Sequence, residues 1–115
     1  MSEFYPGNPA TEFGSVTMAI GTQLSGAINL GRANGGYVYL PAEFNGETIS
    51  WYVSDERDGT YTVANNDGTD ETLTAAGAPR WVAIPETVAK ARFLKIYTSV
   101  AAAAEATIKW MLKGV

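Results

Sequence analysis

The chain has 115 residues, enough for one domain with one modest core. It contains no cysteine and no histidine, which excludes a disulfide framework, a thiolate metal site, a cysteine nucleophile and the commonest general base. Its 8 basic and 12 acidic residues give a net charge of −4 without a basic cluster, so nucleic acid is not an expected partner.

The first 14 residues predict an extended N-terminal arm, and residues 15–115 predict the folded domain. The arm has no hydrophobic period of 2 or 3.6, and it contains prolines, glycines and the aromatic residues Phe4, Tyr5 and Phe13. One interpretation is a frayed terminus. The other is that the three aromatic side chains dock on a neighbouring subunit, which makes them candidate partner-binding residues.

From Ser15 onward, short runs of β-branched and aromatic residues recur between turn signals. This spacing is typical of an all-β fold, and we expect a single antiparallel β-sandwich, jelly-roll-like, with about eight strands. Two alanine-containing stretches, Thr87 to Ala91 and Ala101 to Ala106, are expected to be connections between strands, each able to form a turn or two of helix. The predicted strands are Val16 to Ile20, Ala27 to Leu30, Tyr37 to Leu40, Thr48 to Val53, Thr60 to Val63, Thr72 to Thr74, Arg80 to Ile84 with Phe93 to Thr98, and Thr107 to Leu112.

Alternation of apolar and polar residues indicates which face of a strand is buried. In the run from Thr48 to Val53, the apolar set includes Trp51, and the alternate set includes Tyr52. If Trp51 points into the core, Tyr52 must point outward. We therefore name Tyr52 as a further candidate partner-binding residue. The same alternation predicts these buried side chains in the later strands: Leu94, Ile96, Ile108, Trp110 and Leu112.

Two Asp-Gly dipeptides, Asp58-Gly59 and Asp67-Gly68, are typical of tight hairpin turns. They predict that the stretch from Ile49 to Thr74 is a three-stranded meander.

Three segments resemble chemical sites but are better explained by turns and loops. Asp55, Glu56 and Asp58 could form a glycosidase carboxylate pair, yet nothing in the sequence would desolvate one of them. The run from Asn65 to Glu71 has oxygen ligands but lacks the calcium-loop spacing. The glycine-rich piece from Gly31 to Gly36 lacks a phosphate-binding lysine and is expected to be a loop. No catalytic residue, metal site or cofactor is predicted, and the protein is not expected to be an enzyme.

Several aromatic residues could instead include a sugar-stacking platform on the surface of the sandwich. Aromatic side chains dominate both cores and interfaces, so most of them are expected to be buried or to contact a partner. The residues concerned are Tyr37, Tyr39, Trp51, Tyr52, Tyr61, Trp81 and Tyr97.

No apolar run approaches the roughly 18 residues of a membrane span. The polar start Met1-Ser2-Glu3 does not resemble the beginning of a signal peptide. We therefore expect no membrane partner and synthesis in the cytoplasm.

Four segments carry a resemblance to a known group of proteins: Leu40 to Gly46, Ile49 to Ser54, Asp58 to Tyr61 and Arg92 to Ile96. Together they resemble small β-sandwich virion proteins of tailed bacteriophages. The resemblance extends over about Ile28 to Leu112, and its motifs consist largely of strand and turn residues.

The resemblance implies a structural role in the virion, and it carries over no catalytic residue. The first expectation is a capsid decoration or cement protein that stabilises the head by binding the major capsid protein or another virion protein. It also implies a homo-oligomer, with a trimer as one form, made in the host cytoplasm and located in the virion. The alternative is a carbohydrate-binding β-sandwich module, or a head or tail fibre component, that uses exposed aromatic side chains.

Overall fold

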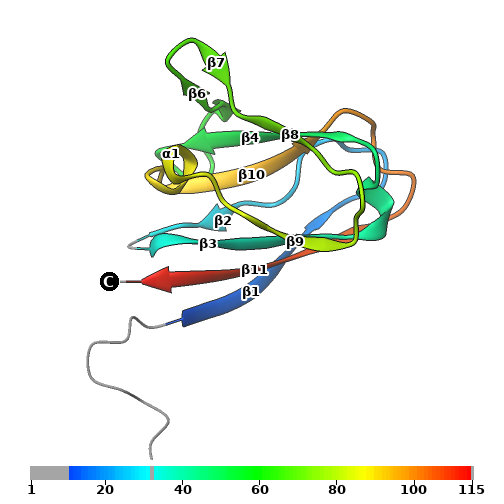
Figure 1. The fold of residues 1–115 in the computed structure, drawn as a ribbon, viewed down its shortest axis with the longest axis horizontal. Coiled ribbons are helices and arrows are strands. Elements are labelled where there is room, and N and C mark those ends of the chain that lie inside the picture. The colour runs from blue at the N-terminus through cyan, green and yellow to red at the C-terminus, as the bar shows by residue number, and fades with distance from the viewer. Residues whose placement is uncertain (1–10, 32, 115) are drawn as a thin grey trace, which may run out of the picture.

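The computed structural model describes residues 11–31 and 33–114, which form two packed β-sheets, a separate two-stranded sheet and short helical connections (Figure 1). The expected all-β sandwich is confirmed. The elements are β1 (Thr11–Met18), β2 (Ile28–Asn29), β3 (Ala33–Leu40), the 3-10 helix η1 (Ala42–Phe44), β4 (Thr48–Ser54), β5 (Thr62–Val63), β6 (Asn65–Asn66), β7 (Thr69–Asp70), β8 (Thr72–Thr74), β9 (Arg80–Ala83), α1 (Glu86–Ala89), β10 (Phe93–Thr98) and β11 (Ala106–Gly114).

The order of the strands is that of a jelly roll. Sheet A has the order β1-β11-β3-β9, and sheet B has the order β2-β10-β4-β5, with β8 also paired to β4. All of these pairs are antiparallel. The first strand therefore lies beside the last, and the second lies beside the next-to-last, in the opposite sheet. Figure 1 shows the two sheets as separate layers, with β10, β4 and β8 above β3, β9 and β11.

The predicted meander from Ile49 to Thr74 is wrong, because β5 and β8 both pair with β4 along the same edge. They form one interrupted strand. Trp51 accepts a hydrogen bond from the N–H of Ala64 (2.7 Å) and donates one to the carbonyl of Glu71 (3.3 Å). Between these two residues the β6–β7 hairpin projects from the sandwich (Figure 1). Its turn is the predicted Asp67-Gly68 pair, where both residues have positive φ.

The core lies between the two sheets and is built from the inward sides of the strands. Trp51 is fully buried, and so are most of the apolar residues that alternation predicts to be inside. Val53 and Trp110 are half-buried and pack against this core. The buried side chains include Met18, Ile28, Val38, Leu40, Ile49, Leu94, Ile96, Ile108 and Leu112.

Some element boundaries differ from the expectation. β1 begins at Thr11, so residues 11–14, assigned to the arm, pair with β11 instead. Gly14 breaks the apolar alternation because the ring of Trp110 occupies the space of its missing side chain. The segment from Gly31 to Gly36 is not simply a loop, since β3 already begins at Ala33.

Candidate interaction surface

The outer face of sheet A carries an apolar row that crosses all four strands. Phe13 lies opposite Met111, Met111 lies opposite Tyr37, and Tyr37 lies opposite Ala83. Residues directly opposite one another in antiparallel strands share one face of the sheet. Phe13 is 73% exposed and Tyr37 is 47% exposed, so large apolar side chains stand in solvent rather than in the core.

A second row on the same face joins a lysine to an aromatic pair. Lys109 lies opposite Tyr39, and Tyr39 lies opposite Trp81. The ring centroids of Tyr39 and Trp81 are 5.4 Å apart with a 58° tilt, and Lys109 Nζ lies 5.7 Å from the Tyr39 ring centroid. We call the two rows, together with Lys113 further along β11, the sheet A face. It comprises Phe13, Tyr37, Tyr39, Trp81, Ala83, Lys109, Met111 and Lys113.

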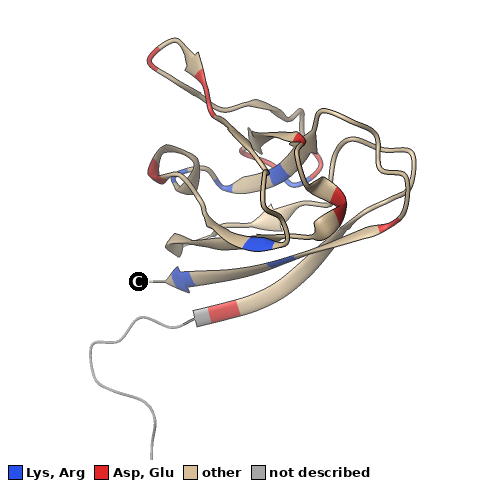
Figure 2. Cartoon of the chain, turned by 45° about the vertical axis from the view of Figure 1, so that its right-hand side comes forward, with Lys and Arg blue, Asp and Glu red and all other residues tan. Residues whose placement is uncertain are grey.

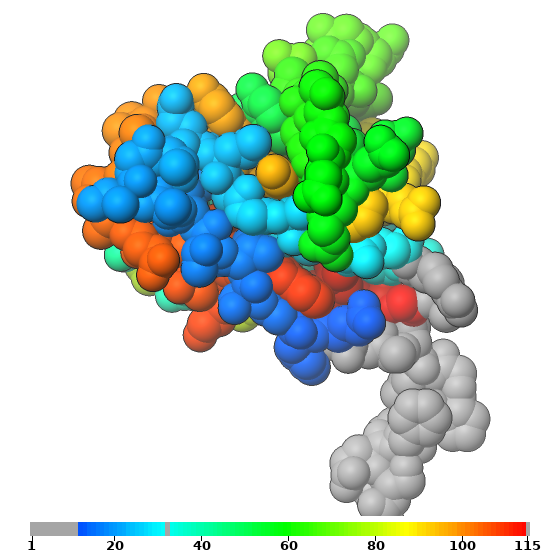
Figure 3. Space-filling view, turned by 180° about the vertical axis from the view of Figure 1, so that it is seen from behind, coloured from blue at the N-terminus to red at the C-terminus, as the bar shows by residue number. Residues whose placement is uncertain are grey.

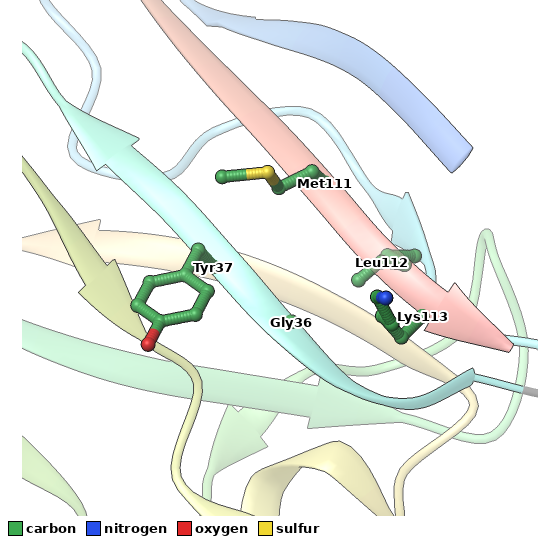
Figure 4. A pocket seen from close by; sticks show the side chains of 5 residues that line it. All are labelled: Gly36, Tyr37, Met111, Leu112 and Lys113. Carbon is green, nitrogen blue, oxygen red and sulfur yellow. The ribbon is translucent and has the colours of Figure 1, made fainter. Parts of the chain in front are cut away.

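A hollow of about 360 Å³ opens on this part of the molecule between β3 and β11. Its lining is almost entirely apolar: Tyr37 and Met111 stand on neighbouring strands beside Leu112, and the stem of Lys113 borders them (Figure 4). The floor includes Gly36, where a Cβ atom would overlap the backbone of the neighbouring strand. The absence of a side chain at Gly36 therefore permits the close approach of β3 to β11.

The charges of the sheet A face have one sign. Its charged residues, Lys109 and Lys113, are both basic and exposed on β11. Most acidic residues lie instead in loops and turns, as Figure 2 shows. A chain with a net charge of −4 thus presents an apolar face with a local positive charge, which suits an acidic partner surface.

The outer face of sheet B differs from the sheet A face. Its aromatic side chains contact one another and nearby polar groups. Tyr52 stacks on Tyr97 with ring centroids 4.8 Å apart and a 17° tilt. The Tyr97 hydroxyl also accepts a hydrogen bond from Gln23 Nε2 at 3.2 Å. Lys95 Nζ lies 4.5 Å from the Tyr61 ring centroid. These contacts leave Tyr52 and Tyr97 half-buried.

The candidate partner-binding residues do not form one site. Phe13 belongs to the sheet A face, whereas Tyr52 points outward from sheet B, as alternation predicts. Phe4 and Tyr5 lie outside the described residues. A partner role for these four residues stays a prediction. Sequence reasoning did not identify the row from Phe13 to Ala83, because that row depends on the register between strands distant in the chain.

The acidic candidates lie in solvent. Asp55, Glu56 and Asp58 are all exposed in the 55–61 loop, as expected of a solvated turn. In the Asn65 to Glu71 run, Asn65 Oδ1 accepts a hydrogen bond from the Gly68 N–H at 2.8 Å, which stabilises the turn. Within residues 11–31 and 33–114, no group of three or more acidic side chains is placed to hold a metal ion.

One carboxyl group stands apart from the rest. Glu47 is half-buried near the loop that contains Val100, at a hollow of about 240 Å³. Its Oε1 atom has no hydrogen-bond partner among the described residues. Burial raises the pKa of Glu47, and a hydrogen bond from the Val100 backbone partly opposes this shift.

No helix in the described ranges has the length and hydropathy of a membrane span. The sequence matches no protein-family model and no curated protein. The fold is similar to the crystal structure of the SPBc2 prophage-derived protein YomS, with a TM-score of 0.58 and 14% sequence identity. The match covers 91% of this chain and 96% of that chain. At this identity, the similarity concerns the fold.

Proposed function

We propose that the chain is a structural protein of a bacteriophage virion that decorates and stabilises the capsid. It would bind the major capsid protein through the sheet A face. The observation that carries the proposal is the apolar row of Phe13, Met111, Tyr37 and Ala83 on the outside of the sandwich. Exposed apolar patches of this kind mark interaction sites on soluble proteins.

The sheet A face has the chemistry of a protein interface. Aromatic residues and methionine are enriched at interfaces, and binding energy concentrates where a side chain fills a pocket. Here Tyr37 and Met111 border the apolar hollow, and Trp81, which is 42% exposed, lies opposite Tyr39 in the second row of the same face. An apolar partner side chain would enter the hollow, and partner carboxylates would lie near Lys109 and Lys113.

The phage context is supported by two similarities. The sequence resembles virion β-sandwich proteins, and the structural neighbour YomS is named as prophage-derived. Jelly rolls also occur in viral capsid proteins. Because one fold serves many functions, the choice of a binding role depends on the sheet A face rather than on the fold.

A decoration protein requires no catalytic group. Many identical copies bound to a symmetric shell add their small individual binding energies. A protein with this role therefore requires only a stable domain and one surface that binds the capsid. The carbohydrate-binding alternative has weaker support, because the 58° tilt between Tyr39 and Trp81 does not give one flat platform for a sugar ring.

The test is cosedimentation of the purified protein with phage capsids that lack it. We expect saturable binding, and we expect the double variant Tyr37→Ala, Trp81→Ala to bind at least about tenfold more weakly, since hot-spot truncations typically cost 1 to 2 kcal/mol or more. Val100→Ala is the matched control, because Val100 is also exposed (58%) but lies in a loop outside this face. Absence of binding, or equal loss in the control, would contradict the proposal.

A further inference from the structure

The four outer edges of the two sheets are protected to different degrees. In sheet A, β9 has only four residues, includes Arg80 and lies between Pro79 and Pro85. In sheet B, β2 has two residues and the β5–β8 edge is interrupted by a hairpin. Short strands, charges, prolines and interruptions are the usual ways in which proteins prevent edge-to-edge pairing.

β1 has none of these protections apart from one acidic residue. It is eight residues long, and its sequence from Thr11 to Met18 contains no lysine, arginine or proline. Glu12 is its single charge. Figure 3 shows β1, in dark blue, at the surface of the molecule beside β11, in red. Of the four sheet edges formed by the described strands, β1 is thus the one that is both long and uninterrupted.

The residues of β1 whose backbone N–H and C=O groups point away from β11 can be identified. Gly26 donates its N–H to the carbonyl of Thr17 at 2.9 Å, so the backbone of Thr17 points away from β11. Backbone groups of an antiparallel strand alternate in direction, and those of Thr11, Phe13 and Ser15 therefore also point away from β11. The N–H and C=O groups of Phe13 and Ser15 have no further backbone partner among the described residues.

We infer that β1 is a dimerisation edge that pairs antiparallel with β1 of a second copy, about a two-fold axis at Phe13. In this register, Phe13 exchanges hydrogen bonds with Phe13 of the partner subunit, and Ser15 exchanges them with Thr11 of the partner subunit. The pairing uses the unpaired backbone groups from Thr11 to Ser15 and leaves the Gly26–Thr17 bond intact. The inference does not depend on the proposed capsid role.

The side chains favour a second copy as the occupant. The two Phe13 side chains become a directly opposed aromatic pair, a favourable cross-strand arrangement. The apolar row of the sheet A face then continues through both subunits, from Ala83 of one to Ala83 of the other. On the inner side, Glu12 lies opposite Gly14, which has no side chain, so the two Glu12 charges do not face each other. One such edge per chain closes the assembly as a dimer.

The test is sedimentation equilibrium of the full chain over a range of concentrations, with amide hydrogen exchange in parallel. We expect a mass of two chains, and protection of the Phe13 and Ser15 amides that rises with concentration. Ser15→Pro removes one edge N–H from each chain, so the dimer loses two hydrogen bonds. At about 1 kcal/mol for each bond, dimerisation should weaken roughly 30-fold. Proline is tolerated at a sheet edge, and Ser15→Ala, which keeps the N–H, should dimerise like the natural chain.

A mass of one chain or of three chains would overturn the inference, and so would a Ser15→Pro variant that dimerises as tightly as the natural chain. Protection of Phe13 and Ser15 that does not depend on concentration would also overturn it, because the edge would then be covered within the same chain. The double variant Tyr37→Ala, Trp81→Ala changes residues that lie away from the β1 edge, so it should leave the dimer intact. Failure of this inference is therefore distinguishable from failure of the capsid proposal.

Discussion

The indole ring of Trp110 lies across the backbone of Gly14, where it fills the space that a side chain at position 14 would occupy. The two residues are direct partners in the pairing of β1 with β11. This contact explains why a glycine stands inside a strand. A larger residue at this position must displace either the ring or the strand.

Gly14→Ala should therefore destabilise the fold by about 1 to 3 kcal/mol, the usual cost of overpacking. Gly35→Ala is the matched control, since Gly35 also lies in a strand of sheet A but a Cβ atom there meets nothing within 4 Å. We expect the control to be neutral or slightly stabilising. Urea denaturation of both variants is the measurement, and equal stability of the two would contradict the contact.

Alanine substitutions at Trp51 and Trp81 should affect stability and capsid binding differently. Trp51 is fully buried, so Trp51→Ala should cost about 3 to 5 kcal/mol of unfolding free energy. Trp81 is 42% exposed on the sheet A face, and Trp81→Ala should cost well under half as much while weakening capsid binding. Chemical denaturation together with cosedimentation checks both; a larger stability loss at Trp81 would be inconsistent with the fold.

The β6–β7 hairpin should be dispensable if it is removed in register. Val63 pairs with Tyr52 and Thr72 pairs with Ser50, while Ala64 and Glu71 both bond to Trp51. Deletion of residues 65–71 therefore joins β5 and β8 into one continuous strand. We expect this variant to fold, as judged by circular dichroism and a cooperative thermal transition.

Deletion of residues 65–70 is the control for register. It leaves Glu71 as one extra residue, so Thr72 to Thr74 would either bulge or turn their side chains to the other face of the sheet. This variant should be clearly less stable than the longer deletion. The reverse order of stability would refute the view that β5 and β8 are one interrupted strand.

Glu47 should make stability depend on pH in a defined direction. Its pKa in the folded state is raised by burial, so between the unfolded and folded values the folded protein binds more protons than the unfolded chain. The protonated form is thus favoured on folding, and this stabilisation is lost as pH rises through the folded pKa. Glu47→Gln keeps a hydrogen-bond acceptor but cannot ionise.

The stability of Glu47→Gln relative to the natural chain should therefore increase between about pH 4 and pH 7. Thermal melts across this range measure the difference. Glu43→Gln, at an exposed position in the nearby η1, is the control for the loss of one negative charge from this part of the surface. A constant difference for Glu47→Gln would mean that burial does not disfavour its charge.

Local patterns in the sequence were sufficient to predict much of the sandwich. Alternation correctly placed Trp51 inside and Tyr52 outside, since a strand has only two faces. Asp67-Gly68 correctly predicted a hairpin turn. Pairing between distant segments was not predictable in this way: the bonds that join both Ala64 and Glu71 to Trp51 are what convert the expected meander into an interrupted edge strand.

The sheet A face illustrates the same limit. Met111 could be predicted to point outward, because it lies directly between Trp110 and Leu112, which both point toward the core. Its position between Phe13 and Tyr37, however, follows only from the register of β11 with β1 and β3. No local signal marks a row whose members come from four different strands.

The most direct test of the central claim is a cryo-electron microscopy map of capsids incubated with the protein. We predict density for the sandwich at fixed lattice positions, with the sheet A face toward the shell and the β6–β7 hairpin away from the contact. Capsids without such density, or density in which Tyr37 and Trp81 face solvent, would contradict the account.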